Sequence, residues 1–246
     1  MDLESSHGER RSALIVGAGS RIAQAIAQAL PTVWPELRVL GVSRSGAPAP
    51  GFDRMLAAPY DASGFAAAAQ AVHTSEPPLA LFVCAIGVLH DAQVTPEKRL
   101  AGLSGDGLRH YFDVNAVAPA LALQAFSPIL PRQQPMRIGI LTAKVGSIAD
   151  NRAGGWYGYR ASKAALNMLV KTAAIELARS HRQAVVVALH PGTTDTPLSQ
   201  PFTGKTPADR LYTPEQTGLR LARVLRALTP GDTGQFLNWD GTPLPW

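Results

Sequence analysis

The chain has 246 residues, a length that one α/β domain can fill, and its 46% hydrophobic and 17% charged residues argue against intrinsic disorder. The formal net charge is +5, but the arginines are scattered along the chain, which argues against a nucleic-acid-binding protein. No apolar run approaches the roughly 20 residues that a membrane helix needs, so we expect no membrane partner.

The beginning of the chain is polar and charged and lacks the apolar stretch of a secretory signal. We therefore expect residues 1–11 to form a flexible extension. The one cysteine, Cys84, allows no internal disulfide and fits a reducing cytosol. We expect a cytoplasmic protein in which Cys84 is a small buried apolar residue.

Short apolar runs alternate with longer helical patterns along the chain, which is typical of a parallel sheet covered on both faces. The runs predict seven strands, over 13–16, 37–42, 54–57, 79–84, 137–141, 184–189 and 235–238. The helical patterns predict five helices, over 20–30, 63–72, 108–130, 157–180 and 214–228. The last helix has a strong start signal, with Thr213 as N-cap, Pro214 in the first turn and Gln216 at the capping-box position. Because no repeat or linker divides residues 1–246, we predict one α/β domain of Rossmann type, a doubly wound seven-stranded parallel sheet with helices on both faces.

Two long segments, 86–104 and 192–212, each follow a predicted strand and are rich in Gly, Pro and Thr. Ligands of open parallel sheets bind beyond the carboxyl ends of the strands, so these segments are predicted walls or lids of a site. The alternative is that they are surface loops without function.

The first predicted strand runs into a glycine-rich turn, Gly17-Ala18-Gly19-Ser20-Arg21-Ile22, that precedes a predicted helix. Such a turn points backbone N–H groups and the positive end of a helix at a pyrophosphate. The motif is degraded, since Arg21 stands where the G-x-x-x-G-x-G pattern has its second glycine, and it either reaches a phosphate or crowds it. We expect Gly17, Gly19, Ser20, Arg21 and Ile22 to bind a dinucleotide.

The second predicted strand ends in Gly41-Val42-Ser43-Arg44. NAD sites usually place a carboxylate there to bind the ribose 2′-hydroxyl, and this stretch has none. An arginine instead suits a 2′-phosphate through bidentate charge-assisted hydrogen bonds. Ser43 and Arg44 therefore favour NADP(H) over NAD(H), unless Arg44 is an ordinary surface arginine.

A phenol and an ammonium group lie four residues apart in Tyr159-Arg160-Ala161-Ser162-Lys163. In a helix this spacing puts both on one face, and a nearby cation is expected to lower the pKa of a tyrosine. Such a tyrosine can donate a proton to a carbonyl oxygen as hydride arrives. The same pair is common on solvated helix faces, but the glycines around 154–158 leave room for a ligand here.

Nearly the whole chain resembles the short-chain dehydrogenase/reductase family, and in particular its C-factor and Sniffer-like carbonyl reductase branch. The resemblance is carried by residues 146–151, by 154–167, and by the ending Asn238-Trp239-Asp240-Gly241 with Pro245-Trp246. It implies that Tyr159 is the general acid/base, and that Lys163 binds the nicotinamide ribose and lowers the pKa of the tyrosine.

The resemblance assigns further roles. Asn115 would hold a water in the proton relay, although it could instead be a helix residue bonded to backbone. Asp61, after the third strand, would contact adenine. In Pro191-Gly192-Thr193-Thr194-Asp195-Thr196, the backbone and Thr196 would hold the nicotinamide carboxamide, and the expected contacts are Pro191, Gly192, Thr194 and Thr196.

Two family features are altered in this chain. The serine that polarises the substrate carbonyl is replaced by Ala143, so Ser147 is the preferred substitute, with Thr142 as the alternative. The N-N-A-G turn after the fourth strand is changed to Cys84-Ala85-Ile86-Gly87, where Gly87 still permits close approach of the backbone.

We therefore expect an NADP(H)-dependent oxidoreductase that reduces a carbonyl, or oxidises an alcohol, of a small and fairly apolar substrate. The alternative is a dinucleotide-binding signalling or regulatory protein with little catalytic activity, which the altered turns favour and which Tyr159, Lys163 and Asn115 oppose. His190 has no Cys or His partner at ligand spacing, so we expect it to be structural and expect no metal. Family members often pair through the helices predicted here over 108–130 and 157–180, which suggests a homodimer or homotetramer, unless these helices only cover the sheet.

Overall fold

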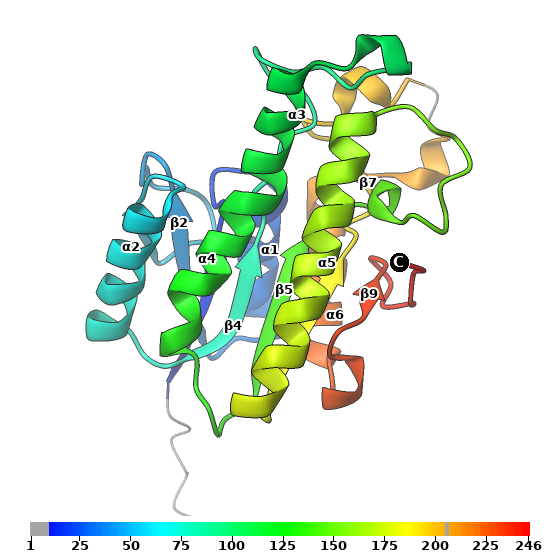
Figure 1. Ribbon diagram of the computed structural model, residues 1–246. Helices are drawn as coiled ribbons and strands as arrows, with labels where there is room; N and C mark the ends of the chain where they lie inside the picture. The colour runs from blue at the N-terminus through cyan, green and yellow to red at the C-terminus, as the bar shows by residue number, and fades with distance from the viewer. Residues whose placement is uncertain (1–9, 205–206) are drawn as a thin grey trace, which may run out of the picture.

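The computed structural model describes residues 10–204 and 207–246 (Figure 1). Residues 1–9 of the predicted flexible extension lie outside the described residues, and Arg11 already belongs to the first strand. No helix in the described part of the chain is long and apolar enough to cross a membrane.

Seven parallel strands form the central sheet, as the sequence predicted, in the order β3-β2-β1-β4-β5-β6-β9. The strand order reverses between β1 and β4, and ligands of such sheets bind beyond the carboxyl ends at this point. The strands are β1 (Arg11–Val16), β2 (Leu37–Ser43), β3 (Arg54–Ala57), β4 (Leu79–Cys84), β5 (Met136–Leu141), β6 (Ala184–Leu189) and β9 (Phe236–Leu237).

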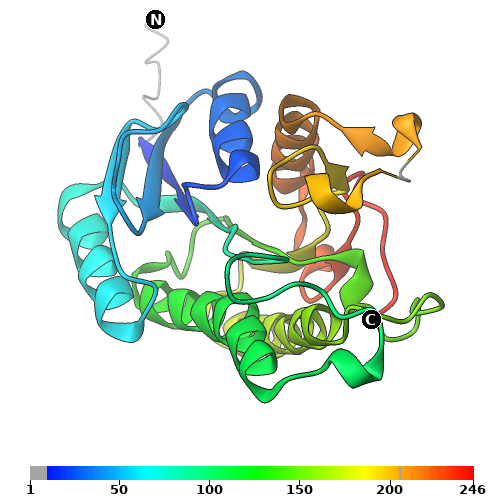
Figure 2. The ribbon, with the colours of Figure 1, turned by 90° about the horizontal axis from the view of Figure 1, so that it is seen from above.

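The described part of the chain holds six α-helices, five of which cover the two faces of the sheet. They are α1 (Arg21–Val33), α2 (Ala62–Ser75), α3 (Gly105–Phe112), α4 (Ala118–Phe126), α5 (Tyr157–Ser180) and α6 (Pro214–Ala227). Helices α1 and α6 pack on one face, and α2, α4 and α5 on the other, as the view from above shows (Figure 2). The inner stretches of the strands are mostly apolar on both sides because alternate residues enter different cores: Leu14 and Val16 join one, and Ala13 and Ile15 the other.

The starts of the helices follow their capping residues. Thr213 and Gln216 form the predicted capping box, in which Thr213 Oγ1 accepts from the Gln216 N–H at 3.2 Å and Gln216 Oε1 accepts from the Thr213 N–H at 3.0 Å. Ser20 caps α1 by accepting from the Ala23 N–H, and Asp61 caps α2 by accepting from the Gly64 N–H, each without a reciprocal side-chain hydrogen bond. Each cap fixes the point at which the chain leaves a strand-end loop and enters its helix.

The predicted helix over 108–130 is wrong in its start, its end and its continuity. The helical segment begins at Gly105, passes through a π-turn over Asp113–Val117, and continues as α4 only to Phe126. A π-turn carries one extra residue, so it changes which side chains face the sheet, and such turns are frequent at functional sites. The sequence also gave no sign of two short paired strands, β7 (Thr193–Thr194) and β8 (Leu211–Tyr212), which join the two ends of the long segment after β6.

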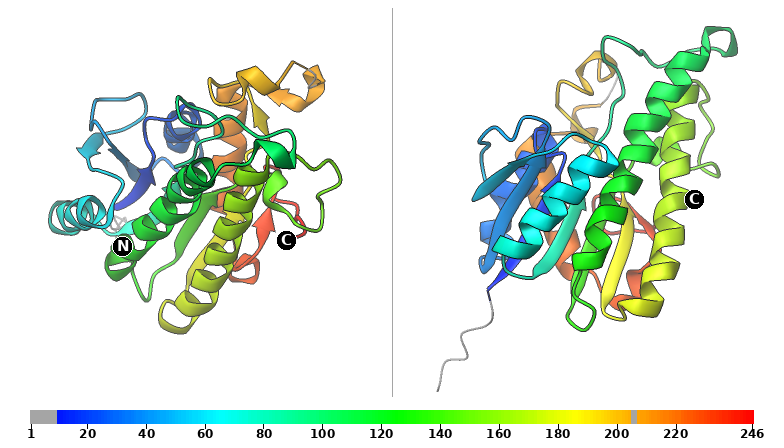
Figure 3. Two further views of the ribbon diagram at one scale, coloured as in Figure 1. Left: turned by 45° about the horizontal axis from the view of Figure 1, so that its top comes forward. Right: turned by 60° about the vertical axis from the view of Figure 1, so that its left-hand side comes forward.

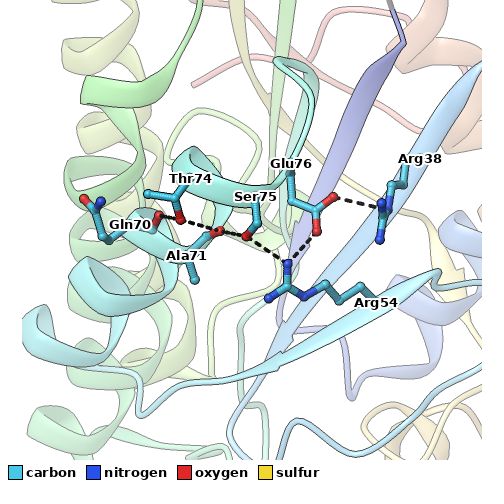
Figure 4. Close-up of polar contacts among 7 residues, drawn as sticks. All are labelled: Arg38, Arg54, Gln70, Ala71, Thr74, Ser75 and Glu76. Atoms are coloured by element: carbon cyan, nitrogen blue, oxygen red, sulfur yellow. Dashed lines mark hydrogen bonds and ion pairs between the residues drawn. The ribbon is translucent and has the colours of Figure 1, made fainter.

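A buried carboxylate joins the amino end of the edge strand β3 to that of its neighbour β2. The Glu76 side chain is 1% exposed, and its oxygens lie 3.2 Å from Arg38 Nε and 2.6 Å from an Arg54 terminal nitrogen (Figure 4). Arg54 also donates to the Ser75 hydroxyl at 3.1 Å. Because Arg38 and Arg54 lie near the starts of β2 and β3, this cluster is at the end of the sheet opposite the strand carboxyl ends. Its role is therefore structural.

Candidate active site

Two adjoining cavities lie beyond the carboxyl ends of the strands. The glycine-turn cavity, of about 290 Å³, is lined by 19–22, 85–88 and Lys163 among others. The aromatic cavity, of about 500 Å³, lies between the loop after β5 and the segment after β6 and includes Trp156 and Phe202. Both predicted wall segments therefore contribute to it or to its neighbour. The residues that line both cavities are Ile22, Thr142, Tyr159, Pro191, Thr196 and Leu198.

Tyr159 stands at the junction of the two cavities, in the first turn of α5. Its ring packs edge-on against Tyr111 and Trp156, each with a centroid distance of 6.2 Å. Trp156 adopts a left-handed backbone conformation with φ 54°, which turns the chain into the helix directly before the tyrosine. This packing leaves Tyr159 8% exposed and fixes its ring.

Lys163 follows one turn later and lines only the glycine-turn cavity. Its Nζ donates to the carbonyl of Leu141 at the end of β5, at 3.4 Å. Burial lowers the pKa of Lys163 to about 8, while nearby Cys84 raises it to a smaller extent.

The net shift in the pKa of Tyr159 is opposite in direction to the one expected from Lys163, whose effect on the tyrosine with nucleotide bound stays a prediction. Burial raises the pKa of Tyr159 above its ordinary value, because the phenolate would have to exist in a desolvated position. Tyr159 is therefore a neutral phenol at physiological pH. This is the protonation state that a proton donor requires.

Asn115 is fully buried in the π-turn and joins three segments. Its Oδ1 accepts from the Val88 N–H at 2.7 Å, and its Nδ2 donates to the Val88 carbonyl at 2.9 Å and to Ser162 Oγ at 3.1 Å. The side chain is thus bonded to backbone, as the plainer of the two interpretations predicted. Its part in a water relay stays a prediction.

Gly87, in the altered turn after β4, leaves little room for a side chain. A Cβ at this position would lie 3.1 Å from Lys163 Nζ and 3.3 Å from Asn115 Oδ1. The turn therefore lies directly against two of the predicted site residues. Cys84, before it, is buried and unpaired as expected, and its burial raises the pKa of the thiol to about 11.

The structure places the two candidates for the missing serine differently. The Thr142 hydroxyl is buried, lines both cavities, and has no hydrogen-bond partner among the described residues. Ser147 lines neither cavity, because a short 3₁₀ turn over Lys144–Gly146 directs it elsewhere. Its Oγ donates to the Trp246 carbonyl at 3.3 Å and accepts from the Asp150 N–H at 3.0 Å. The preference for Ser147 over Thr142 is therefore reversed.

The glycine-rich turn is shaped by two different requirements. Gly17 has φ +86°, and a Cβ there would lie 2.7 Å from the Ala85 carbonyl carbon, so packing demands a glycine. A Cβ at Gly19 would meet no protein atom within 4 Å, so packing makes no such demand there. Ser20 caps α1, whose first turn holds no acidic residue, and Arg21 and Ile22 line the cavity. The open space at Gly19 beside a helix N-terminus suits a phosphate group.

Ser43, Arg44 and Asp61 line neither cavity, but Ser43 and Arg44 lie close to the glycine-rich turn. Gly17 and Ala18 both donate backbone hydrogen bonds to the Val42 carbonyl at 3.0 Å, so Ser43 and Arg44 follow the residue that the turn contacts. Ser43 Oγ accepts from the Gly46 N–H at 3.0 Å, and the exposed Arg44 guanidinium lies 5.8 Å from the Tyr60 ring.

Asp61 is exposed, and its Oδ1 accepts from the Gly64 N–H at 2.8 Å. This hydrogen bond, followed by one from the Ser63 hydroxyl, lowers the pKa of the Asp61 carboxyl. Both of these hydrogen bonds use Oδ1, and Oδ2 has no hydrogen-bond partner among the described residues.

The turn after β6 forms the opposite wall of the site. Pro191 and Thr196 line both cavities. Gly192 has φ +81°, and a Cβ at this position would lie 3.0 Å from ring carbons of both Trp239 and Tyr212. The Thr194 hydroxyl is 2.8 Å from Thr217 Oγ1 and is thus held by α6. Thr196 is 7% exposed and remains directed at the site.

Sequence reasoning missed the aromatic wall of the larger cavity. Trp156 and Phe202 lie 46 positions apart in the chain, yet their rings meet edge-on at 5.2 Å. Nothing in the local sequence signals this contact. His190 also lines the cavity, and burial lowers its pKa to about 4, so it is neutral at physiological pH.

Comparisons with known proteins agree with this architecture. A family model described as "Enoyl-(Acyl carrier protein) reductase" matches residues 57–241. The chain is 35% identical over 159 residues to "1-hydroxy-2-glutathionyl-2-methyl-3-butene dehydrogenase" of Rhodococcus sp. (strain AD45), covering 65% of this chain and 67% of that protein. It is 34% identical over 135 residues to "C-signal" of Myxococcus xanthus, covering 55% of this chain and 76% of the relative.

Solved structures share the fold over nearly the full length. The carbonyl reductase Sniffer of D. melanogaster superposes with a TM-score of 0.81 at 20% identity, covering 97% of this chain and 100% of that one. An NADPH-bound carbonyl reductase from chicken fatty liver gives a TM-score of 0.79 at 24% identity, covering 97% of this chain and 95% of that one. The family match spans most of the chain, C-signal supports the expected C-factor-like branch, and Sniffer shares the fold. The chain belongs to the short-chain dehydrogenase/reductase family and is an oxidoreductase of that type.

Proposed function

We propose that the protein is an NADP(H)-dependent reductase of carbonyl compounds, with Tyr159 as the proton donor and, in the reverse direction, the acceptor. The observation that carries the proposal is the position of Tyr159, which lines both cavities and so can face a cofactor and a substrate together. A protein that only bound a dinucleotide for signalling would not need a second cavity at its tyrosine, and no structural observation favours that alternative.

The glycine-turn cavity fits a nicotinamide dinucleotide. The open space at Gly19 and the capped, acid-free start of α1 suit the pyrophosphate, and Arg21 borders the same cavity. Lys163 lines this cavity and would bond the nicotinamide ribose, and the turn from Pro191 to Thr196 would hold the carboxamide. When bound, the dinucleotide supplies the hydride.

The chain's own residues manage the proton and the carbonyl. Tyr159, kept neutral by burial, donates its proton to the substrate oxygen. Thr142 offers an uncommitted hydroxyl at the same junction and would stabilise the negative charge that develops on that oxygen. Asn115 holds the segment at Val88 against α5 and so keeps Gly87 beside Lys163.

The preference for NADP(H) rests on Arg44. It is an exposed arginine directly after β2, beside the residue that the glycine-rich turn contacts, and the stretch holds no carboxylate. A guanidinium at this edge matches a 2′-phosphate and offers nothing specific to a 2′-hydroxyl. The NADPH-bound chicken carbonyl reductase of the same fold supports this choice.

Nucleotide titration tests the cofactor proposal. We expect Arg44→Asp to weaken NADPH binding about 10- to 100-fold, since it removes a charge-assisted contact and adds repulsion, while NADH binding changes far less. The measurement is nicotinamide fluorescence during titration of purified protein. As a control, Arg179→Asp alters an exposed arginine at the far end of α5 and should leave both affinities unchanged. Absence of binding of either nucleotide to the unaltered protein would contradict the whole proposal.

A second pair of variants separates the two hydroxyl candidates. Thr142→Val keeps the shape of the side chain and removes its hydroxyl, and we expect it to lower kcat about 10- to 100-fold. Ser147→Ala should change kcat by less than about threefold, because its hydroxyl is bonded to backbone away from the cavities. Steady-state reduction of a small aldehyde at saturating NADPH measures both, and a larger loss in Ser147→Ala would restore the original preference.

We also propose a homo-oligomer formed through α4 and α5, such as a homodimer or homotetramer. A cavity of about 370 Å³ lies between these helices, and Met168, Leu169 and Ile175 are exposed on α5. Exposed apolar side chains beside a groove suit a second copy of the same face. We propose that the chain forms a single domain, because one sheet lies between two continuous hydrophobic cores. We also propose a cytoplasmic location, which the buried and unpaired Cys84 supports.

A further inference from the structure

The aromatic cavity combines a buried, neutral floor with a charged rim. Tyr159, Thr142 and Ala143 are buried at its floor, and the rings of Trp156 and Phe202 form its wall. The rim belongs to the exposed loop between β5 and α5, which projects outward before α5 begins (yellow-green in Figure 3), and the segment after β7 lines the same cavity. With about 500 Å³, the cavity can hold a ligand that extends from the floor to the rim.

The charges that line this cavity are unbalanced. Lys144, Arg152 and Arg160 line it, and Asp150 is the one acidic residue among its described lining residues. His190 adds no charge, because burial and, to a smaller extent, Lys144 lower its pKa to about 4. Three cations therefore face one carboxylate, which leaves a net positive potential over the mouth of the site.

Two of the three cations are already engaged. Lys144 Nζ lies 3.4 Å from Asp150 Oδ2. Arg160 Nε donates to the Gly155 carbonyl at 2.9 Å, and one of its terminal nitrogens donates to the Val145 carbonyl at 3.2 Å. These contacts hold the loop against α5, and they occupy the ammonium of Lys144 and N–H donors of the Arg160 guanidinium that could otherwise bind a ligand.

Arg152 is the cation that remains. It is exposed on the rim and makes no hydrogen bond or ion pair with any described residue. A guanidinium presents five N–H donors in a planar fork that matches a carboxylate in a bidentate pair. A ligand that reaches from Tyr159 to the rim would therefore meet an uncommitted anion-binding group.

We propose that the substrate is an apolar carbonyl compound that carries a carboxylate, and that Arg152 binds this carboxylate at the rim while the carbonyl lies at Tyr159. The inference rests on the proposed reductase function and adds the charge of the substrate to it. The aromatic wall holds the apolar body, and the expectation of a small, fairly apolar substrate is extended by one anionic group.

A pair of aldehydes that differ in charge tests the inference. The probes are 4-carboxybenzaldehyde and 4-formylbenzamide, which have nearly the same shape. We expect kcat/KM of the unaltered protein to be at least about 10-fold higher for the carboxylate, mainly through KM, and the difference to shrink in 0.5 M salt, an ionic strength of about 0.5 M. Arg152→Gln should lower kcat/KM for the carboxylate about 10-fold and change that for the amide less than about twofold. The control Arg179→Gln should preserve the preference.

Calorimetric binding of both aldehydes, with and without NADP⁺, gives a second measure that needs no turnover. Tighter binding of the carboxylate that disappears in Arg152→Gln supports the inference even if neither probe is reduced. Equal kcat/KM or equal affinity for the two probes, or an equal loss of both in Arg152→Gln, overturns it. Those results leave the reductase function in place wherever NADPH binds and an aldehyde is reduced, whereas failure to bind NADPH speaks against the reductase function itself.

Discussion

Replacing Tyr159 with phenylalanine is expected to lower kcat for carbonyl reduction by about 10³-fold, within the range that a positioned acid contributes. The ring contacts with Tyr111 and Trp156 persist in Tyr159→Phe, so the fold and the shapes of both cavities are preserved. What disappears is the buried neutral phenol, the proton donor at the junction of the cavities. Steady-state kinetics at saturating NADPH measure the loss.

Nucleotide binding separates a chemical defect from a structural one. Because the glycine-rich turn and Lys163 are untouched, Tyr159→Phe should bind NADPH within about twofold of the unaltered protein. Tyr157→Phe is the matched control, since Tyr157 is an exposed tyrosine two positions earlier in the same helix, and it should keep full activity. Undiminished turnover in Tyr159→Phe would remove this residue from the mechanism.

The pH dependence of reduction follows from the same burial. The pKa of Tyr159 lies above its ordinary value, so the phenol stays protonated as the pH rises through neutrality. A fall in the rate of reduction above pH 8 would then come from Lys163, whose pKa is lowered to about 8. The spacing of the pair in the sequence suggested a lowered pKa for Tyr159, because spacing indicates the neighbouring charge but not the desolvation of the phenol.

The sheet could be predicted because the signals for its strands lie within short stretches of the sequence. Parallel strands covered on both faces are continuous apolar runs, and β4 and β6 were placed with the bounds that the structure shows. The helix starts at Ser20 and Thr213 follow from capping residues in the same short windows. Such features need no knowledge of distant parts of the chain.

The details of the site depend on contacts that are distant in sequence. The π-turn at Asn115 accompanies its hydrogen bonds to Val88, 27 positions away. Ser147 is drawn to the Trp246 carbonyl, 99 positions away, which leaves Thr142 as the hydroxyl at the cavities. Spacing within the loop after β5 could name both candidates but could not decide between them. The aromatic wall formed by Trp156 and Phe202 was out of reach for the same reason.

We expect the buried ammonium group of Lys163 to lower the free energy of unfolding of the protein. Its pKa is lowered from 10.5 to about 8 because folding buries the ammonium group. Below pH 8 the lysine is charged in both the folded and the unfolded protein, and the shift corresponds to a cost of about 3 kcal/mol. As the pH rises from 8 to 10.5, the folded protein loses this proton first, so the cost diminishes and then vanishes.

Lys163→Met should therefore raise the free energy of unfolding at pH 7 by up to about 3 kcal/mol while lowering kcat/KM at least about 100-fold. Denaturant unfolding without nucleotide, at pH 7 and again near pH 10.5, measures the gain and its expected disappearance at the higher pH. Lys171→Met is the control, because Lys171 lies on the same helix, is only partly buried, and donates to the Gly234 carbonyl at 2.9 Å, so it should give no gain. If Lys163→Met is less stable than the unaltered protein at pH 7, the interactions of the ammonium group with its surroundings outweigh the free-energy cost of burying it. That result would contradict the expected destabilisation by Lys163.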